Sequence, residues 1–316
     1  MHNSPTFILL EAMHWQDYEL LDSGDGLKLE RFGKYIFARP ESQAMWSRSL
    51  PQRDWDTAHA IFQPTAEESG GHWDFKKRVD EKWEMKYDLT PSPSPLRRGA
   101  QLRFWAMTTP GRHLGVFPEV AAHWDFMAGL IQKANLHPEH GRREPVKVLN
   151  LFGYTGLATL SAAAAGAQVT HVDASKKSVN WARENQALSG LNEKPIRWIV
   201  EDAVKYMQRE EKRGVRYDGI ILDPPKFGRG PKGEVWEVYK SLPHLFEVCR
   251  ACLSENPLFV IATLYAVRAS AIHVAQALDE MMKKYKGQID SGELVTREKS
   301  ANRLLSQAVY ARWWAE

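Results

Sequence analysis

Four apolar runs in the chain end on residues that can bind a ligand or take part in a reaction. The residues at these ends are 150–156, 173–175, 202–203 and 223–227. The carboxylates among them accept hydrogen bonds from hydroxyl, amine and ring N–H groups, and the glycines let a ligand approach the backbone. If the runs are parallel strands of one sheet, their ends line one edge and face a common ligand. Each end therefore indicates one part of that ligand.

The first end is a glycine-containing turn that leads into an alanine-rich, helix-like segment. It reads Asn150, Leu151, Phe152, Gly153, Tyr154, Thr155 and Gly156. Its glycines permit a tight turn, and the amides at a helix N-terminus favour an anionic group. Many strand–turn–helix units share this pattern, so by itself it does not separate a nucleotide-like site from an ordinary turn.

The second end predicts a ribose. Asp173 lies twenty positions after Gly153, the spacing at which an acid accepts hydrogen bonds from the two ribose hydroxyls. Ala174 and Ser175 follow it and complete the same end. The alternative is a helix cap, because Asp173 or Ser175 can serve the N-terminus of the next helix.

The third end predicts an adenine. The Asp202 carboxylate would accept from an exocyclic amine, while Ala203 offers its backbone N–H; the alternative is again a cap. The turn at 153–158 lacks the G-x-G-x-x-G spacing expected for a pyrophosphate. A ligand with ribose and adenine but no pyrophosphate fits better, and S-adenosylmethionine is such a ligand.

The fourth end, 223–227, indicates methyl transfer. Pro224 and Pro225 lack a backbone donor and hold the chain extended, so the Asp223 carboxylate and a proline carbonyl project rigidly. These acceptors would hold a planar amine or ring N–H towards a methyl sulfonium, and Phe227 would stack on the ring. In-line displacement depends strongly on positioning. The alternative is a proline-rich turn that leaves a strand.

Basic residues follow this end in a glycine-rich stretch. Arg229 and Lys232 predict a substrate loop, with an ordinary surface loop as the alternative. Lys226 is predicted either to contact a phosphate of the substrate or to be solvated.

The elements that would position these ends alternate between strand-like and helix-like segments from Val146 onward. The strand-like segments are 146–152, 168–174, 195–202, 217–225 and 257–265, and two further ones, 291–297 and 306–315, predict an antiparallel hairpin. Helix-like segments separate the first five. We expect a Rossmann-like, doubly wound, seven-stranded α/β sheet over residues 113–316.

Residues 1–112 predict a separate, small, β-rich domain. The segment 18–40 reads as strands around a turn at 24–26, and 82–89 and 102–109 as further strands, while 90–99 reads as a proline- and serine-rich loop. Seven of the 12 tryptophans lie before residue 125, which predicts an aromatic core or an aromatic surface.

With these residues in hand, the chain resembles the class I S-adenosylmethionine-dependent methyltransferases. More narrowly it is similar to the bacterial 23S rRNA methyltransferases that act on cytosine carbon-5 or guanine N7, on the motifs VLNLFGYTGLATLSAAAAGA, VTHVDASKKSVNWARENQ, EDAVKYMQRE and DPPKFGRG. The resemblance spans about residues 113–265. It implies S-adenosylmethionine as cofactor, S-adenosylhomocysteine as product and RNA as partner. It also implies that Phe117 and Glu119 contact the cofactor and that the N-terminal domain grips RNA.

One departure concerns the mechanism. Carbon-5 methylation needs a covalent nucleophile, and in the cytosine branch a cysteine follows the fifth strand. Here 261–265 contains none, whereas Cys249 and Cys252 sit on the preceding helix and predict helix packing. Two thiols without paired histidines also fall short of a zinc site, so no metal is expected. The sequence therefore favours direct transfer to a nitrogen or oxygen.

Composition sets the remaining expectations. The 316 residues are 43% apolar and 26% charged, with a net charge of +3, which permits nucleic acid as a partner without requiring it. Two cysteines, no signal-peptide pattern and no membrane-length apolar run predict a cytoplasmic protein without a membrane partner. The alternatives are methylation of a protein or small molecule, a non-catalytic RNA-binding protein, and an NAD-dependent oxidoreductase. The sequence does not predict whether the protein is a monomer or a homodimer.

Overall fold

The computed structural model describes residues 6–65, 70–89, 101–136, 144–265 and 270–316. The chain forms two compact units. Unit 1 comprises Met1–Leu10, Ala122–Leu294 and Ala308–Glu316, and unit 2 comprises Glu11–Ala121 and Val295–Gln307. The predicted domain boundary between residues 112 and 113 stays a prediction.

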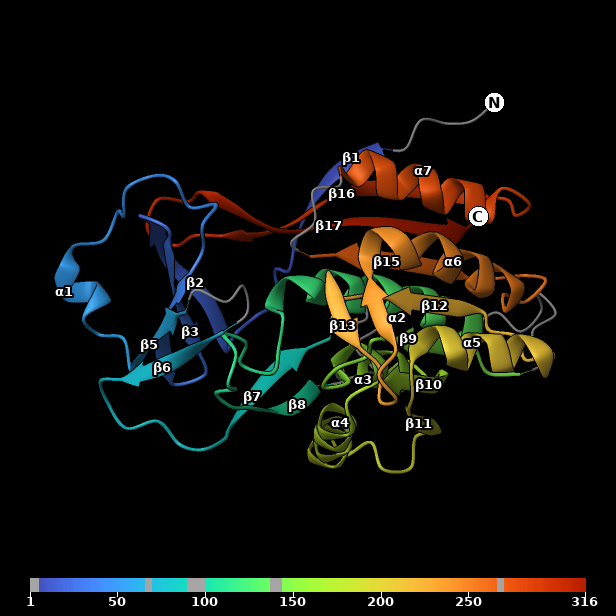
Figure 1. The fold of residues 1–316 in the computed structure, drawn as a ribbon, viewed down its shortest axis with the longest axis horizontal. Coiled ribbons are helices and arrows are strands. Elements are labelled where there is room, and N and C mark those ends of the chain that lie inside the picture. Colours follow the sequence, from blue (N-terminus) through green and yellow to red (C-terminus); the bar gives the residue numbers. More distant parts are fainter. Residues whose placement is uncertain (1–5, 66–69, 90–100, 137–143, 266–269) are drawn as a thin grey trace. The chain divides into compact units, whose positions relative to one another are not determined.

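Unit 1 is built on an eight-stranded sheet with the order β1-β16-β17-β15-β12-β9-β10-β11 (Figure 1). The strands are β1 (Thr6–Glu11), β9 (Lys147–Leu151), β10 (Gln168–Asp173), β11 (Ile196–Val200), β12 (Gly219–Leu222), β15 (Phe259–Leu264), β16 (Gly287–Arg297) and β17 (Leu304–Ala315). Strands β11, β10, β9, β12 and β15 are parallel, and β17 runs antiparallel to β15. All seven predicted strands are present, so the Rossmann-like fold is confirmed, and β1 adds an eighth.

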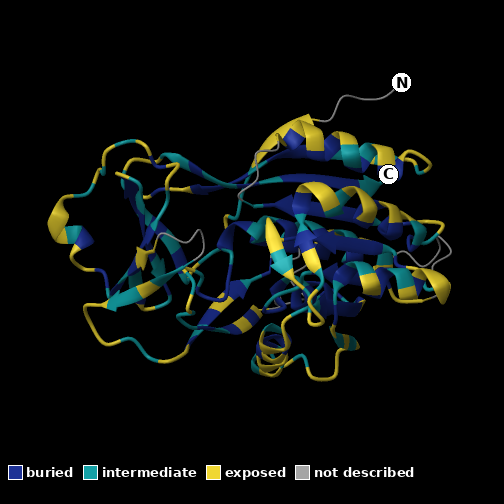
Figure 2. Cartoon of the chain, viewed as in Figure 1, coloured by how far each residue is buried: buried dark blue, intermediate teal, exposed yellow. Residues whose placement is uncertain are grey.

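Helices cover both faces of this sheet, and its central strands β12 and β15 are accordingly buried along their whole length (Figure 2). They are α2 (Ala121–Leu136), α3 (Leu157–Ala164), α4 (Lys176–Leu188), α5 (Ala203–Lys212), α6 (Val238–Ala251) and α7 (Ala271–Met282). In β9, Leu149 and Leu151 join the apolar core beneath α5, α6 and α7, whereas Asn150 between them contacts Thr159 on α3. Since side chains alternate along a strand, α3 lies on the face opposite α5–α7.

The segment predicted as a basic loop is instead a small two-stranded ribbon. Its strands are β13 (Phe227–Arg229) and β14 (Val235–Glu237), which pair antiparallel. The pairing continues at its base, where the Val238 amide donates to the Lys226 carbonyl at 3.0 Å. The ribbon therefore connects the end of β12 to the start of α6.

Unit 2 is β-rich, as predicted. Its five-stranded sheet has the order β2-β3-β4-β5-β6, and β7 and β8 form a separate pair. The elements are β2 (Tyr18–Gly24), β3 (Leu27–Phe32), β4 (Tyr35–Pro40), α1 (Gln52–Trp55), β5 (Ala60–Pro64), β6 (Gly71–Phe75), β7 (Trp83–Asp88), β8 (Gln101–Ala106) and the 3-10 helix η1 (Pro118–Val120). Asp25 has a φ of 52° in the predicted turn between β2 and β3. The predicted loop at 90–99 lies outside the described residues.

Of the seven tryptophans before residue 125, three are buried in the core and four are partly accessible. Trp83 stacks on Phe37 with ring centroids 5.5 Å apart, and Trp73 meets the same ring edge-on at 5.4 Å. Within the described residues, no helix is both long and apolar enough to cross a membrane.

Candidate functional site

The pairing register brings three of the predicted strand ends to one edge of the sheet. Leu151 of β9 pairs with Val172 of β10 on one side and with Leu222 of β12 on the other. Each of these residues is followed by a predicted site residue, so the three loops leave the sheet from adjacent positions. This edge carries the carboxyl ends of the parallel strands, where ligands bind in doubly wound sheets.

The loop after β9 has an unusual backbone. Phe152 and Tyr154 have φ values of 58° and 47°, although neither is glycine, and Gly156 has a φ of 83°. Non-glycine residues in the left-handed region cost energy and cluster at ligand sites. Gly156 begins α3, and no side chain caps that N-terminus. The loop therefore presents a glycine-started helix to the carboxyl edge of the sheet.

Asp173 holds this loop in place. One oxygen of its carboxylate accepts from the Tyr154 amide at 2.9 Å, and the other accepts from the Ser175 amide at 2.8 Å. Burial raises the pKa of Asp173, and the two amide hydrogen bonds oppose that shift. Each carboxylate oxygen can accept a further hydrogen bond. Asp173 therefore holds its loop and keeps the capacity to accept further hydrogen bonds, and its predicted contact with a ribose stays a prediction.

For the second strand end, the sequence predicted either a ribose contact or a helix cap. Ser175, and not Asp173, caps α4: its hydroxyl accepts from the Ser178 amide at 3.1 Å. Ala174 lies half-buried between them. The cap therefore leaves the Asp173 carboxylate to its loop.

A buried polar chain lies beneath the loop. The Asn150 amide donates to the Thr159 hydroxyl at 2.9 Å, and that hydroxyl lies 2.9 Å from His171 Nδ1. Burial lowers the pKa of His171 to about 3. A Cβ on Gly153 would lie 2.4 Å from the His171 ring, so only glycine lets the loop descend this far. Asn150, predicted as a cofactor contact, thus supports the loop from below.

Thr155 and the third strand end also make structural contacts. Thr155 is buried, and its carbonyl accepts from Asn185 Nδ2 at 2.9 Å. Asp202 caps α5 by accepting from the Lys205 amide at 3.0 Å, and Ala203 is buried in the first turn of that helix. The cap reading of Asp202 is therefore correct, and its predicted contact with adenine stays a prediction.

The fourth end combines a buried base with an exposed tip. Asp223 is half-buried and Pro224 is buried, whereas Pro225 and Lys226 are exposed and Phe227 is 55% exposed. Arg229 and Lys232 are exposed on the ribbon that follows. An exposed phenylalanine beside an acid and two prolines is consistent with a stacking role.

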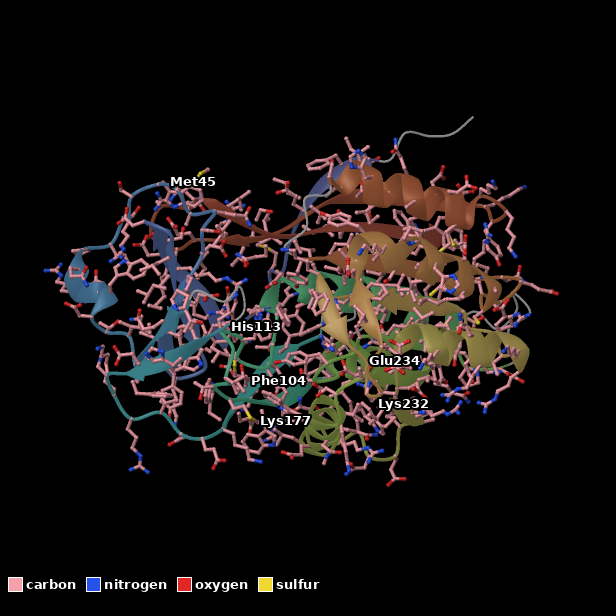
Figure 3. The ribbon with its side chains drawn as sticks, in the orientation of Figure 1. Met45, Phe104, His113, Lys177, Lys232 and Glu234 are labelled. Atoms are coloured by element: carbon pink, nitrogen blue, oxygen red, sulfur yellow. The ribbon has the colours of Figure 1, made fainter. Side chains whose placement is uncertain are left out.

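Three residues that sequence reasoning missed anchor this end. The indole N–H of Trp236 donates to the Pro225 carbonyl at 2.6 Å, and its ring lies 5.0 Å from the Phe152 ring. Glu234 forms an ion pair with Lys205 on α5, which lowers the pKa of Glu234 to about 2. Figure 3 labels Glu234 and Lys232 on the turn of the ribbon. In the sequence Val235, Trp236 and Val238 are all apolar, so the pattern there did not single out Trp236 as a buried strand residue.

Phe117 and Glu119 belong to unit 2. Glu119 is buried, and its charge acts on Tyr18 and Arg39. The Phe117 ring lies 4.7 Å from the ring of His113. Their predicted contact with a cofactor stays a prediction.

The cysteines lie away from these loops. Cys249 is on α6 and Cys252 caps its C-terminal end, and both are fully buried. Burial raises the pKa of Cys249 well above its ordinary value and that of Cys252 to about 11. Both thiols are therefore protonated at neutral pH and inaccessible, as the helix-packing prediction requires.

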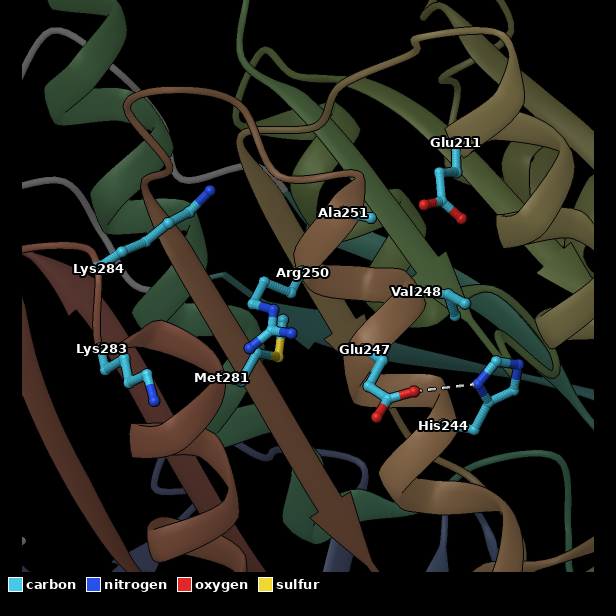
Figure 4. A pocket seen from close by; sticks show the side chains of 9 residues that line it. All are labelled: Glu211, His244, Glu247, Val248, Arg250, Ala251, Met281, Lys283 and Lys284. Carbon is cyan, nitrogen blue, oxygen red and sulfur yellow. Dashed lines mark hydrogen bonds and ion pairs between the residues drawn. The ribbon is translucent and has the colours of Figure 1, made fainter.

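A separate hollow lies on the helical surface (Figure 4). Its lining includes Glu211 of α5, Val248 of α6 and Met281 of α7, all near the C-terminal ends of their helices. These helices start at the carboxyl edge of the sheet and run back, so the hollow belongs to the opposite edge. It contains none of the predicted site residues.

The fold and the edge residues together define a class: a doubly wound nucleoside-binding protein of the methyltransferase type. Asp173 holds the loop that leads through Gly156 into α3, and its carboxylate oxygens can accept further hydrogen bonds. This arrangement fits the adenosyl group of S-adenosylmethionine, whose ribose carries a diol. A family model described as S-adenosylmethionine-dependent methyltransferase matches residues 136–256. A crystal structure of an S-adenosylmethionine-dependent methyltransferase from Agrobacterium tumefaciens is 42% identical, covers 100% of this chain and 98% of its own, and has a TM-score of 0.87. The chain therefore belongs to the S-adenosylmethionine-dependent methyltransferase family.

Two curated relatives are ribosomal RNA methyltransferases. The ribosomal RNA large subunit methyltransferase K/L of Hahella chejuensis is 30% identical over 202 residues, which are 62% of this chain and 26% of that protein. The ribosomal RNA large subunit methyltransferase I of Klebsiella pneumoniae is 39% identical over 82 residues, 26% of this chain and 20% of that protein. The chain spans 12% to 26% of the length of the curated relatives it matches.

Proposed function

We propose that the protein transfers a methyl group from S-adenosylmethionine to a base of RNA, by direct transfer to a nitrogen or oxygen. The observation that carries this proposal is the paired row Val172, Leu151 and Leu222, which starts the cofactor and acceptor loops side by side. Two of the chain's relatives bear names that state methylation of large-subunit ribosomal RNA, which supports RNA as the substrate class.

The cofactor side is assigned to the loops after β9, β10 and β11. Asp173 would accept from the ribose hydroxyls, and the glycine-started α3 would face the anionic end of the cofactor. Asp202 and Ala203 would border the adenine. S-adenosylmethionine supplies an electrophilic methyl group when it is bound; the residues of the chain bind and orient.

The acceptor side is assigned to residues 223–227. The Asp223 carboxylate and the Pro224 carbonyl would accept from an amine or ring N–H of the base and fix its plane, while Phe227 would stack on it. Lys226, Arg229 and Lys232 would contact phosphates of the same strand. Positioning of this kind is the main service an enzyme can give to an in-line displacement.

Direct transfer follows from where the thiols are. Attack on carbon-5 of a pyrimidine needs a thiolate next to the ring. The run after β15 has none, and Cys249 and Cys252 are buried at the far end of α6 with raised pKa values. A nitrogen or oxygen acceptor carries its own lone pair and needs no thiolate.

The test is transfer of a labelled methyl group from S-adenosylmethionine to unmodified ribosomal RNA, with the nucleoside identified by mass spectrometry. The proposal predicts label on a base nitrogen or oxygen. Label in 5-methylcytidine would overturn direct transfer. Binding of S-adenosylhomocysteine without label in any RNA would replace RNA by a protein or small-molecule acceptor, and preferential binding of NAD would replace the methyl donor itself.

A further inference from the structure

Trp236 is buried on a ribbon that is otherwise exposed. Its side chain is 5% exposed, whereas Val235 beside it and Phe227 on the paired strand are 57% and 55% exposed. A two-stranded ribbon is at best marginally stable in water by itself. Trp236 is part of the apolar core of unit 1, so its side chain joins the ribbon to the folded sheet.

The indole fixes the acceptor loop by a hydrogen bond. Its N–H donates to the Pro225 carbonyl at 2.6 Å, which sets the plane of the peptide between residues 225 and 226. Pro224 and Pro225 carry no N–H, so neither residue can hold this stretch by donating a backbone hydrogen bond. Because proline also fixes φ, an anchor at the Pro225 carbonyl restricts the Pro224 carbonyl one residue earlier.

The same indole touches the cofactor loop. Its ring lies 5.0 Å from the Phe152 ring at an interplanar angle of 57°. Phe152 opens the strained loop that the Asp173 carboxylate holds through the Tyr154 amide. One side chain therefore contacts both the loop assigned to the methyl donor and the loop assigned to the acceptor.

The residues around Trp236 are closely packed at the base of the ribbon. Gly228 is the residue that pairs with Trp236 across the ribbon. A Cβ on Gly228 would lie 3.3 Å from Pro225 Cγ, a tight contact in which the proline ring would have to shift by a few tenths of an ångström. The proline ring, the glycine and the indole thus form a packed unit at the base of the ribbon.

We propose that Trp236 is a positioning residue for methyl transfer, which sets the acceptor loop 223–227 against the cofactor loop 152–156. This inference rests on the proposed function of that edge. Misplacement of reacting groups by about 1 Å can lower a rate roughly 100-fold, so a bridge between the two loops matters even without touching either substrate.

The first test separates positioning from packing with two matched variants. Trp236→Phe keeps an aromatic ring against Phe152 and removes the hydrogen bond to Pro225. Trp313→Phe makes the same change in the same apolar core, on β17, where the indole packs near Tyr285 at 6.1 Å. We expect both variants to bind S-adenosylhomocysteine within a few-fold of wild type. Only Trp236→Phe should slow single-turnover transfer, by about 10- to 100-fold. An unchanged rate in Trp236→Phe, or an equal loss in Trp313→Phe, would overturn the proposal.

The second test needs no methyl acceptor and uses the wild-type protein. Addition of S-adenosylhomocysteine should shift the indole N–H resonance of Trp236 and the amide resonance of Phe227, and leave the indole of Trp313 unchanged. A response at Gly153 without one at Trp236 and Phe227 would refute the positioning role alone. No response at any residue would refute the proposed cofactor site instead. If the cofactor responses appear but no RNA is methylated, the acceptor class fails while the positioning result stands.

Discussion

At the scale of single residues, Asp173 does not cap the helix that follows it, which was the alternative to a ribose contact. It ties Tyr154 and Ser175 through their amides and keeps acceptor capacity towards the carboxyl edge. The capping duty falls to Ser175, which frees the acid from its own helix. Asp202 is the reverse case, since its carboxylate does cap α5.

Asp173→Asn is therefore expected to weaken S-adenosylhomocysteine binding about 10- to 100-fold, the value of one or two hydrogen bonds to a charged group. Isothermal titration calorimetry measures this. Asp218→Asn is the matched control, because Asp218 also accepts two hydrogen bonds, from the Lys147 amide and the Ser254 hydroxyl, at the opposite edge of the sheet. Equal affinities of the two variants would show that Asp173 has only a structural role.

For the two cysteines we expect that substitution leaves methyl transfer intact. Cys249→Ala and Cys252→Ala should each retain the single-turnover rate of transfer within about threefold, although each removes a buried group and lowers the melting temperature. A covalent mechanism predicts loss of transfer by several orders of magnitude in one of them. Loss of transfer in a variant whose circular dichroism matches wild type would refute direct transfer.

At the scale of elements, the strands that the sequence predicted and those it missed differ in a physical way. The parallel strands are buried on both faces and read as apolar runs, so their pattern is local. Strand β1 has largely exposed residues, and it lies beside Gly292, where a Cβ would be 1.8 Å from the Ile8 carbonyl oxygen. That fit joins segments nearly three hundred positions apart, which no local pattern reveals. Strands β5 and β6 are likewise short and half-exposed.

The sequence predicted the strand ends that form the candidate site, but not the contacts that hold them. The four strand ends are visible in the sequence because acids, glycines and prolines follow apolar runs. The role of Trp236 was not visible, because its partners Phe152 and Pro225 lie 84 and 11 positions away and meet it only in the folded sheet. The contact of Asn150 with Thr159 was hidden for the same reason.

The turn after β9 gives a prediction at this scale. Gly153→Ala should weaken S-adenosylhomocysteine binding and destabilise the protein by about 1–3 kcal/mol, because the new methyl group would meet the His171 ring. That ring is held by Thr159 and packs on Trp198 at 4.7 Å, so it cannot easily yield.

The matched control is Gly129→Ala in the exposed interior of α2, where nothing lies within 4 Å of the new Cβ. It should stabilise the protein by about 1 kcal/mol, as alanine does in a helix. Denaturant unfolding and calorimetry measure both variants. Unchanged binding and stability in Gly153→Ala would contradict the tight seat of the loop.

At the scale of the whole molecule, buried neutral histidines link stability to pH. Burial lowers the pKa of His171 and of His113 to about 3 and that of His123 well below its ordinary value. The unfolded chain binds these protons near pH 6.5 and the folded chain does not. Stability is therefore fully present above pH 6.5 and falls as the pH drops from there towards 3.

His171→Gln tests this link. It should reduce the loss of unfolding free energy between pH 7 and pH 5.5 by about 1 kcal/mol, the contribution of one histidine that stays neutral in the fold. His273→Gln makes the same replacement at an exposed position on α7 and is the control for the substitution itself. Urea unfolding at the two pH values decides between them. An identical pH dependence in His171→Gln and wild type would contradict the buried neutral state.

In the proposed function, residues 223–227 present an RNA base to a methyl group bound beside Asp173. The most direct measurement compares wild type with Asp223→Ala in the transfer of labelled methyl groups to unmodified ribosomal RNA, alongside calorimetric binding of S-adenosylhomocysteine. We expect label on a base nitrogen or oxygen with wild type, and no detectable transfer by Asp223→Ala at nearly unchanged affinity for S-adenosylhomocysteine. Transfer by Asp223→Ala at the wild-type rate would contradict the proposed function.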